Sequence, residues 1–236
     1  RDNIAKTAIV TGASRGIGAA IARRLARDGM QLVVNYASGK AAADALVASI
    51  LADGGAAIAV KANVADAGDV QALFAAAEAA FGGVDVLVNN AGIMPPALPA
   101  LADTDDATFD SLFAINVKGS FHTMRQAAAR LRHGGSVVNF SSSVMGLALP
   151  GYSIYGASKA AIETMTTIFA KELRGKNITV NAVAPGPTAT ALFLNGKTEA
   201  TIERMSQMAP LARLGTPEDI AAAVAFLAGP DGRWIN

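Results

Sequence analysis

The sequence contains no cysteine and only two histidines among its 236 residues. Without cysteine, a disulfide framework, a thiol nucleophile and a thiolate metal ligand are all excluded. A histidine-based zinc site would need more ligands, and a Ser-His-Asp hydrolase would have to recruit His122 or His133. We expect His133, in RLRHGG, at the exposed end of a helix before a glycine stop. We expect His122 to be a surface or interface residue of a helix, so neither histidine is a catalytic candidate.

Charge is also scarce, and neither sign dominates. Lys and Arg number 20 against 19 for Asp and Glu, and charged residues make up 17% of the chain. A domain that binds nucleic acid or an acidic membrane surface would show an excess of basic residues, so neither partner is expected. The first residues, RDNIAKTAIVTGAS, have neither a signal-peptide pattern nor a spanning run. We therefore expect a soluble, cytoplasmic protein.

Short apolar runs rich in Val and Ile alternate with longer Ala-rich segments of helical spacing. Strands are predicted at 7–11, 31–36, 56–64, 84–92, 135–142 and 178–186, and helices at 17–28, 40–52, 66–81, 107–132, 153–174 and 217–227. The strands are apolar along nearly their whole length, as in a parallel sheet covered on both faces. The strict alternation predicts a doubly wound α/β sheet, and the lack of a linker or repeat predicts one domain over residues 1–236.

One region, residues 187–214, breaks this rhythm because it carries bulky Leu, Phe and Met residues without strand alternation. It is either a helical hairpin packed on the core or a mobile lid with an apolar face over a substrate pocket. Its position directly after the sixth strand favours the lid.

A glycine-rich turn, TGASRGIG, joins the first strand to the first helix and contains Gly12, Gly16 and Gly18. Glycine permits a tight turn and a close backbone approach, while the helix N-terminus offers free N–H groups to a phosphate. A glycine trio alone is weak evidence, because any sharp turn uses glycine. Its place between the strand and the helix of a βαβ unit predicts a nucleotide site.

Tyr155 and Lys159 lie four residues apart in a predicted helix, so their side chains share one face. A nearby ammonium favours the phenolate, which makes such a pair a tuned general acid or base. Taken alone, the pair is equally compatible with an incidental helix contact. Ser142 adds a hydroxyl at the end of the fifth strand, where ligands bind in open α/β sheets.

Three motifs together resemble the short-chain dehydrogenase/reductase family. They are TGxxxGxG at Thr11, Gly12, Gly16 and Gly18, NNAG at Asn89, Asn90, Ala91 and Gly92, and PG at Pro185 and Gly186. The resemblance covers essentially the whole chain in the family's order. It implies a Rossmann fold with strand order 3-2-1-4-5-6 and helices on both faces, and the family's final edge strand is expected to be missing from this sequence.

The resemblance also implies a catalytic group of Asn116, Ser142, Tyr155 and Lys159. The family serine precedes the tyrosine by thirteen positions, which selects Ser142 over Ser141 and Ser143. Ser142 is expected to polarise a carbonyl while Tyr155 donates the proton and a nicotinamide delivers hydride. Lys159 is expected to lower the pKa of Tyr155 and to hold the nicotinamide ribose, and Asn116 to anchor a water that connects Lys159 to solvent.

The cofactor is predicted to be NADP (NADPH). An NAD site normally has Asp or Glu at the end of the second strand, where this chain has Tyr36. Arg15, Ser38 and Lys40 supply cations and a hydroxyl for a 2′-phosphate, unless the two cations are only solvated surface charges. Asn63 stands where the family has an aspartate that contacts adenine.

The full set of expected contacts follows from these motifs and from position. The cofactor contacts are Gly12, Ser14, Arg15, Gly16, Ile17, Gly18, Tyr36, Ala37, Ser38, Asn63, Val64, Asn90, Ala91, Gly92, Tyr155, Lys159, Pro185, Gly186 and Thr188. The substrate wall is expected at Met94, Ser142, Val144, Met145, Tyr152, Leu192 and Phe193. No metal is expected.

The family resemblance is nearest to 3-oxoacyl-[acyl-carrier-protein] reductases, which implies a 3-oxoacyl thioester substrate. A carbonyl reductase or alcohol dehydrogenase acting on small ketones and aldehydes is the alternative, and a non-catalytic NADP-binding regulator a remote one. An acidic acyl-carrier protein would need cations beside the cleft, for which Arg130, Arg132, Arg174 and Lys176 are the candidates. A homotetramer or homodimer is also implied, with the helices that contain Asn116 and Tyr155 as its faces.

Overall fold

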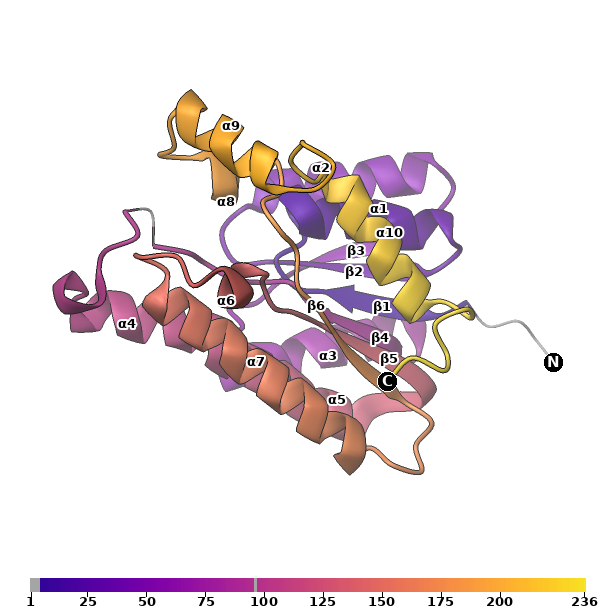
Figure 1. Cartoon of the computed structure of the whole chain (residues 1–236). Coiled ribbons are helices and arrows are strands. Elements are labelled where there is room, and N and C mark those ends of the chain that lie inside the picture. Colours follow the sequence, from indigo (N-terminus) through magenta and orange to yellow (C-terminus); the bar gives the residue numbers. More distant parts are fainter. Residues whose placement is uncertain (1–4, 96) are drawn as a thin grey trace.

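The computed structural model describes residues 5–95 and 97–236, and its centre is a six-stranded parallel sheet (Figure 1). The strands are β1 (Thr7–Val10), β2 (Gln31–Tyr36), β3 (Ala56–Lys61), β4 (Val84–Asn89), β5 (Leu131–Phe140) and β6 (Thr179–Val183). Their order in the sheet is β3-β2-β1-β4-β5-β6. The predicted fold class and strand order are therefore confirmed.

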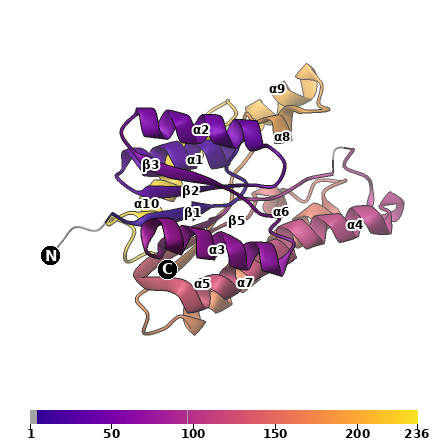
Figure 2. The same cartoon turned by 180° about the vertical axis from the view of Figure 1, so that it is seen from behind.

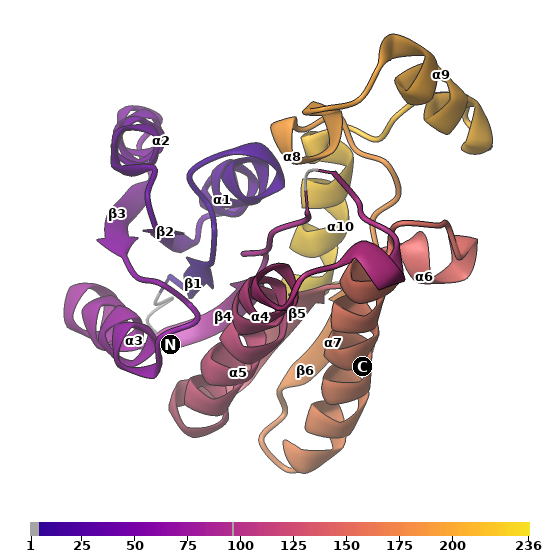
Figure 3. The same ribbon diagram turned by 90° about the vertical axis from the view of Figure 1, so that its left-hand side faces the viewer.

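Helices cover both faces of this sheet (Figures 2 and 3). One face carries α1 (Gly16–Arg27), α2 (Lys40–Ala52) and α10 (Pro217–Ala228), and the other carries α3 (Ala67–Phe81), α5 (Gly119–Arg130) and α7 (Ser153–Glu172). Successive residues of each strand point to opposite faces, so Ala8 and Val10 pack in the first layer and Ile9 in the second. Both layers are filled by Val, Ile, Leu and Ala, which explains why the strands are apolar throughout.

The long helix predicted at 107–132 has a different internal structure. It consists of α4 (Asp106–Phe113), a π-helical turn (Ala114–Lys118) and α5. The helix also ends earlier, because Leu131 is buried in the core and pairs with Val84 as the first residue of β5. His133 consequently lies in a strand, which corrects the expected helix end, although its side chain is exposed.

The predicted ends of three other helices are confirmed. Gly29 and Gly54 follow α1 and α2 with φ angles of +87° and +83°, the left-handed conformation that glycine adopts without strain. At the start of α10, the Thr216 hydroxyl accepts a hydrogen bond from the Asp219 N–H, and the Asp219 carboxylate accepts one from the Thr216 N–H. This reciprocal capping box fixes where the chain re-enters the helical layer.

Residues 187–214 form two short helices, α8 (Ala191–Leu194) and α9 (Glu199–Met208), which stand apart from the helical layers (Figure 3). A third short helix, α6 (Val144–Leu147), follows β5. After α10 the chain runs beside β6, where the Asn236 side chain accepts a hydrogen bond from the Val180 N–H (2.7 Å). In the described part of the chain, no helix is both long and apolar enough to cross a membrane.

Candidate active site

The glycine-rich turn lies between β1 and α1, and two of its glycines are required by close contacts. Gly12 has a φ of +61°, and a Cβ atom there would lie 2.9 Å from the Ala91 Cα. A Cβ atom on Gly18 would lie 2.6 Å from both the Asn90 Nδ2 and the Gly12 carbonyl oxygen. Any side chain at either position would push the turn away from the NNAG segment.

The same turn leaves the N-terminus of α1 open. Arg15 is the N-cap residue in an extended conformation, and its side chain makes no capping hydrogen bond. The first N–H groups of a helix have no partner within the helix, and they bind phosphate well. The narrow glycine turn and the open helix end therefore fit the pyrophosphate of a dinucleotide.

The TG and NNAG motifs are bonded directly to each other. The Thr11 hydroxyl accepts hydrogen bonds from the N–H groups of Asn90 and Ala91, both at 3.0 Å. The Asn90 side chain donates to the carbonyl oxygens of Thr11 (2.9 Å) and Gly12 (3.1 Å). Asn35, which the sequence analysis did not identify, accepts a hydrogen bond from the Gly12 N–H (3.1 Å). These bonds hold the turn in one shape.

On the adenosine side, the cations predicted for a 2′-phosphate do not all converge. Tyr36 is buried, whereas Ala37 and Ser38 are exposed at the end of β2. Lys40 forms an ion pair with Asp44 one turn along α2, with a distance of 2.6 Å between Nζ and Oδ2. This pairing raises the pKa of Lys40. Arg15 is the exposed cation of the turn itself.

The predicted adenine contact also has local partners. Asn63 is exposed, and its side-chain oxygen accepts a hydrogen bond from the Ala65 N–H (3.1 Å). The neighbouring Val64 is buried, and its carbonyl oxygen lies 3.1 Å from Nδ1 of His122. His122 is therefore a buried residue that ties α5 to this loop, which corrects its expected surface position.

Tyr155 and Lys159 lie on α7 and face the carboxyl end of the sheet. The Lys159 Nζ is 5.6 Å from the centroid of the Tyr155 ring, and it donates a hydrogen bond to the Phe140 carbonyl oxygen at the end of β5 (2.9 Å). Burial lowers the pKa of Lys159 to about 8. Burial raises the pKa of Tyr155 and the Ser142 hydroxyl partly opposes this effect, so the expected lowering of this pKa by Lys159 is not seen. Tyr155 is thus held as a neutral phenol that can donate a proton.

Asn116 lies in the π-helical turn and is fully buried. Its side-chain oxygen accepts a hydrogen bond from the Ile93 N–H (2.8 Å), and its amide donates to the Ile93 carbonyl oxygen (3.0 Å) and the Ser158 hydroxyl (3.2 Å). A Cβ atom on Gly92 would lie 3.3 Å from the Asn116 oxygen and 3.6 Å from the Lys159 Nζ. Gly92 therefore lets the backbone come close to both side chains, which a larger residue at this position would crowd.

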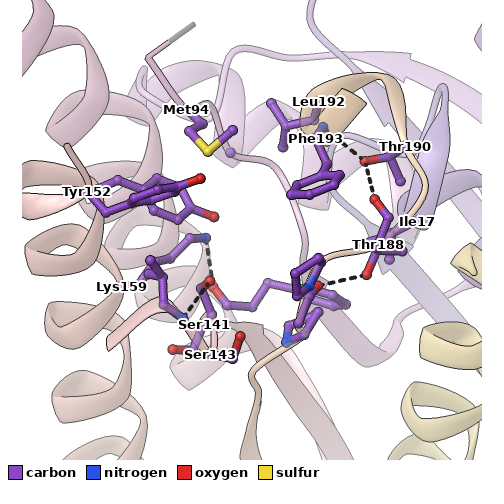
Figure 4. A pocket seen from close by; sticks show the side chains of 18 of the residues that line it. Ile17, Met94, Ser141, Ser143, Tyr152, Lys159, Thr188, Thr190, Leu192 and Phe193 are labelled. Carbon is purple, nitrogen blue, oxygen red and sulfur yellow. Dashed lines mark hydrogen bonds between the residues drawn. The ribbon is translucent and has the colours of Figure 1, made fainter. Parts of the chain in front are cut away.

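A cavity of about 140 Å³ opens at this end of the sheet. Figure 4 shows Tyr152 and Lys159 on one side of it, Leu192 and Phe193 on the other, and Met94 between them. It is lined by Ile17, Asn90, Gly92, Ile93, Met94, Phe140, Ser141, Ser142, Ser143, Val144, Leu147, Leu149, Tyr152, Tyr155, Lys159, Pro185, Gly186, Pro187, Thr188, Thr190, Leu192, Phe193 and Met205. Among the described residues that line the cavity, Lys159 is the only charged one.

The cavity brings together most of the predicted substrate wall. Met145 is the exception, because the helix α6 places its neighbours Val144 and Leu147 in the lining instead. Leu147, Leu149 and Met205 line the cavity although the sequence analysis did not identify them. The apolar residues in these segments were a signal for a cavity wall, but the sequence alone could not tell which of their side chains face the cavity.

The proposed docking cations lie at the wrong end of the molecule. Arg130 and Arg132 stand at the start of β5, and Arg174 and Lys176 lie just before the start of β6. Because all strands are parallel, these are the amino ends, whereas the cavity is at the carboxyl ends. Arg130 and Arg132 are also paired with Glu78 and Asp85. The expectation of basic residues beside the cleft is wrong for these four.

Within residues 5–95 and 97–236, no group of three or more His, Cys, Asp or Glu side chains is arranged to hold a metal ion. The polar groups at the cavity are instead hydroxyls, amides and one ammonium. This set suits hydrogen bonding to a carbonyl and proton transfer.

Known proteins are similar to this chain along most of its length. A family model described as "Enoyl-(Acyl carrier protein) reductase" matches residues 12–236. The chain is 48% identical to a short-chain type dehydrogenase/reductase of Picea abies, over 98% of this chain and 88% of the relative. It is 46% identical to a chloroplastic NADPH-dependent aldehyde reductase-like protein of Arabidopsis thaliana, over 98% of this chain and 90% of the relative.

Solved structures of other proteins are also similar to this chain. A short chain dehydrogenase from Burkholderia cenocepacia J2315, in complex with NADP, matches with a TM-score of 0.92 and 39% identity, over 100% of this chain and 95% of that chain. The fold, the glycine turn and these similarities lead to one conclusion: the chain belongs to the short-chain dehydrogenase/reductase family.

Proposed function

We propose that the protein reduces the aldehyde or ketone group of a small, uncharged, largely apolar molecule with NADPH. The observation that carries this proposal is the cavity, whose walls are apolar and whose base holds the hydroxyls of Ser142 and Tyr155 beside Lys159. The protein is an NADP-dependent oxidoreductase, as expected for a chain so similar to an NADPH-dependent aldehyde reductase-like protein and to a dehydrogenase in complex with NADP.

One set of residues in this chain would bind the cofactor, and another would transfer the proton. The glycine turn and the N-terminus of α1 would hold the pyrophosphate, and Pro185, Gly186 and Thr188 border the cavity where the nicotinamide would lie. When bound, NADPH supplies the hydride. Arg15 is placed to meet a 2′-phosphate at the adenosine end, since its side chain is exposed at the helix start.

At the reacting carbonyl, the Ser142 hydroxyl donates a hydrogen bond to the oxygen and the Tyr155 hydroxyl donates its proton. Lys159, fixed by the Phe140 carbonyl, stabilises the negative charge that develops on Tyr155. Asn116 keeps the loop at Ile93 in place, and a water bound near it would return the proton through Lys159. In alcohol oxidation the same groups act in reverse, with Tyr155 as the base.

Residues 187–214 supply the opposite wall and act as a lid in this proposal. Leu192, Phe193 and Met205 line the cavity, while Leu192 remains half exposed to solvent. Closure over an apolar substrate would bury this exposed surface and exclude water from the reacting carbonyl. The lid belongs with the sheet to one domain of 236 residues.

A 3-oxoacyl thioester is the second candidate, supported by the acyl-carrier-protein reductase family whose model matches. It is the weaker candidate because the four cations that were expected to dock a carrier protein lie at the opposite end of the sheet.

A homodimer or homotetramer is supported by the exposed Phe109, Phe121 and Ile168 on α4, α5 and α7. A cytoplasmic location also remains a prediction. Light scattering would test the assembly.

The substrate class is tested by following NADPH oxidation with a matched panel. The panel contains aryl and alkyl ketones, the corresponding aldehydes, a 2-oxo acid and an acetoacetyl thioester. We expect the highest kcat/KM with neutral apolar ketones or aldehydes and a poor reaction with the 2-oxo acid, because the lining offers no cation for its carboxylate other than Lys159. Preference for the thioester would reverse the order of the two candidates. No reduction of any carbonyl would contradict the proposed function.

A further inference from the structure

Ser141, the residue before Ser142, has a partner of its own on α7. Its hydroxyl donates a hydrogen bond of 2.7 Å to the Glu163 carboxylate, and its N–H donates to the Val183 carbonyl oxygen of β6 (2.8 Å). Ser141 is only 4% exposed, whereas Glu163 is partly exposed, so the donor end of this contact is buried. One side chain thereby connects the end of β5 to the catalytic helix.

Glu163 follows Lys159 by four residues, and Lys159 follows Tyr155 by four. The three side chains therefore lie along one face of α7. Lys159 donates to the carbonyl oxygen of Phe140, and Glu163 accepts from the hydroxyl of Ser141. Two consecutive residues of the β5 end are thus attached to two consecutive turns of α7.

Regular sheet pairing ends just before this point. The register of β5 with β4 runs to Asn139, and its register with β6 runs to Phe140. Beyond it, the Ser142 hydroxyl accepts a long hydrogen bond from the Val144 N–H (3.3 Å) and contacts the Tyr155 hydroxyl. The position of Ser142 relative to Tyr155 consequently depends on the bonds of its neighbours to α7 and β6.

We propose that Glu163 is a positioning residue for carbonyl reduction. By accepting the hydrogen bond of Ser141, Glu163 fixes the position of the Ser142 hydroxyl relative to the Tyr155 hydroxyl, so that both reach the same carbonyl oxygen. This role rests on the proposed function, because it requires that Ser142 and Tyr155 act on a substrate carbonyl. Glu163 itself touches neither the substrate nor the cofactor, and it acts through the Ser141 hydroxyl.

The test uses four variants of the full chain and one matched control. Glu163→Ala removes the acceptor, Ser141→Ala removes the donor, and Glu163→Gln keeps an oxygen that can accept the Ser141 proton. The double variant Ser141→Ala/Glu163→Ala measures coupling, and Thr164→Ala changes an exposed neighbour on the same helix. For each protein, kcat, KM, the Kd for NADPH, the pH profile and Tm are measured.

We expect Glu163→Ala and Ser141→Ala each to lower kcat about tenfold with KM and the Kd for NADPH nearly unchanged, as when an interaction of the transition state is lost. The double variant should be no slower than the slower single variant, because both changes break one bond. Glu163→Gln should keep most of the wild-type kcat and the wild-type pH profile. Thr164→Ala should match the wild type.

Several results would overturn the proposal. A Glu163→Ala enzyme with lowered Tm but wild-type kcat would show a purely structural role, as would additive losses in the double variant. If Glu163→Ala fails to fold, Ser141→Ala decides alone, since it removes only one hydroxyl. A shifted pH profile in Glu163→Gln would indicate an electrostatic effect on Lys159 instead. If the wild type reduces no carbonyl, the proposed function itself is wrong. The wild-type assay therefore separates this outcome from a failure of the positioning role, which only the variants reveal.

Discussion

The two walls of the cavity are built differently. The wall formed by the ends of β4 and β5 and by α7 is buried and heavily hydrogen-bonded: Lys159 is only 5% exposed, and Asn116 of the adjoining π-helical turn is fully inaccessible. The wall formed by residues 187–214 includes two short helices and is more open, with Leu192 at 52% exposed. One wall is part of the core and the other lies on top of it.

This difference separates chemistry from selectivity. Groups that transfer a proton must be held within fractions of an ångström, which a buried network on strands and helices provides. A wall of apolar side chains on short helices can change its shape with little cost to the core, and it contributes mainly shape and water exclusion. Changes on the first wall should therefore lower kcat, and changes on the second should alter KM and the order of preferred substrates.

Tyr155→Phe should have the largest effect. The substitution keeps the ring and removes only the proton donor, so we expect kcat for carbonyl reduction to fall about a thousandfold. The Kd for NADPH should stay within about threefold of the wild-type value, because binding does not require the phenol proton. Tyr152→Phe is the matched control, since Tyr152 lines the same cavity, and it should lose less than about tenfold. Steady-state kinetics and NADPH titration check both values, and a similar loss in the two variants would break the distinction between them.

The second prediction concerns pH. Burial lowers the pKa of Lys159 to about 8 and raises the pKa of Tyr155, so below pH 8 the pair consists of an ammonium and a neutral phenol. As pH rises through about 8, Lys159 loses the charge that favours the developing phenolate. Reduction should then slow by up to about tenfold per pH unit.

The control for this pH dependence is Lys159→Met, measured over the same pH range. It should be slower than the wild type by about a hundredfold at neutral pH, and it should lack the decline near pH 8. If the variant keeps the wild-type decline, another group is responsible and the assignment to Lys159 is wrong.

Arg15→Ala tests the cofactor end of the site, at the start of α1, and should have a smaller effect. Loss of the exposed guanidinium should lower the preference for NADPH over NADH about tenfold, mainly through KM, because a charge-assisted bond to the 2′-phosphate is removed. Lys40→Ala serves as a control, since Lys40 is already paired with Asp44. Competition kinetics with both cofactors measure the ratio. An equal loss for NADPH and NADH would show that Arg15 does not recognise the 2′-phosphate.

Phe193→Ala should have the smallest effect on kcat and a clear effect on selectivity. Phe193 lines the cavity from α8, and Lys197 covers its ring with Nζ 4.6 Å from the centroid. Truncation should raise KM for a bulky apolar ketone about tenfold and change kcat by less than about threefold. Leu211→Ala, an exposed residue of the same segment outside the lining, should leave both values unchanged. A large fall in kcat for Phe193→Ala would give this wall a direct part in the chemistry.

The buried wall was easier to predict from the sequence than the wall formed by residues 187–214. Apolar strands, the glycines between β1 and α1, and the four-residue spacing of Tyr155 and Lys159 are local signals with a direct physical cause, whereas Ser142 was selected by the family resemblance. The π-helical turn at Asn116 was not predictable, because it depends on bonds to Ile93, a residue 23 positions away. Asn35 was missed for the same reason, since its partner Gly12 belongs to another βα unit.

One error had a signal that could have prevented it. The four cations assigned to carrier-protein docking precede strands, and in a parallel sheet every strand start lies opposite the ligand edge. The burial of His122 had no local signal, because its partner, the Val64 carbonyl oxygen, lies 58 positions away in the sequence. The second wall was less predictable, because the short helices α8 and α9 expose most of their surface and their faces follow from tertiary contacts.

The central claim is that this cavity transfers hydride from NADPH to a carbonyl while Tyr155 supplies the proton. Its most direct test uses NADPH in which both hydrogens of the nicotinamide carbon that gives up the hydride are deuterium, together with an apolar aryl ketone. The account predicts deuterium on the carbinol carbon of the product made by the wild type, and about a thousandfold less labelled product with Tyr155→Phe under the same conditions. An unlabelled alcohol, or equal labelling by the two proteins at equal rates, would contradict it.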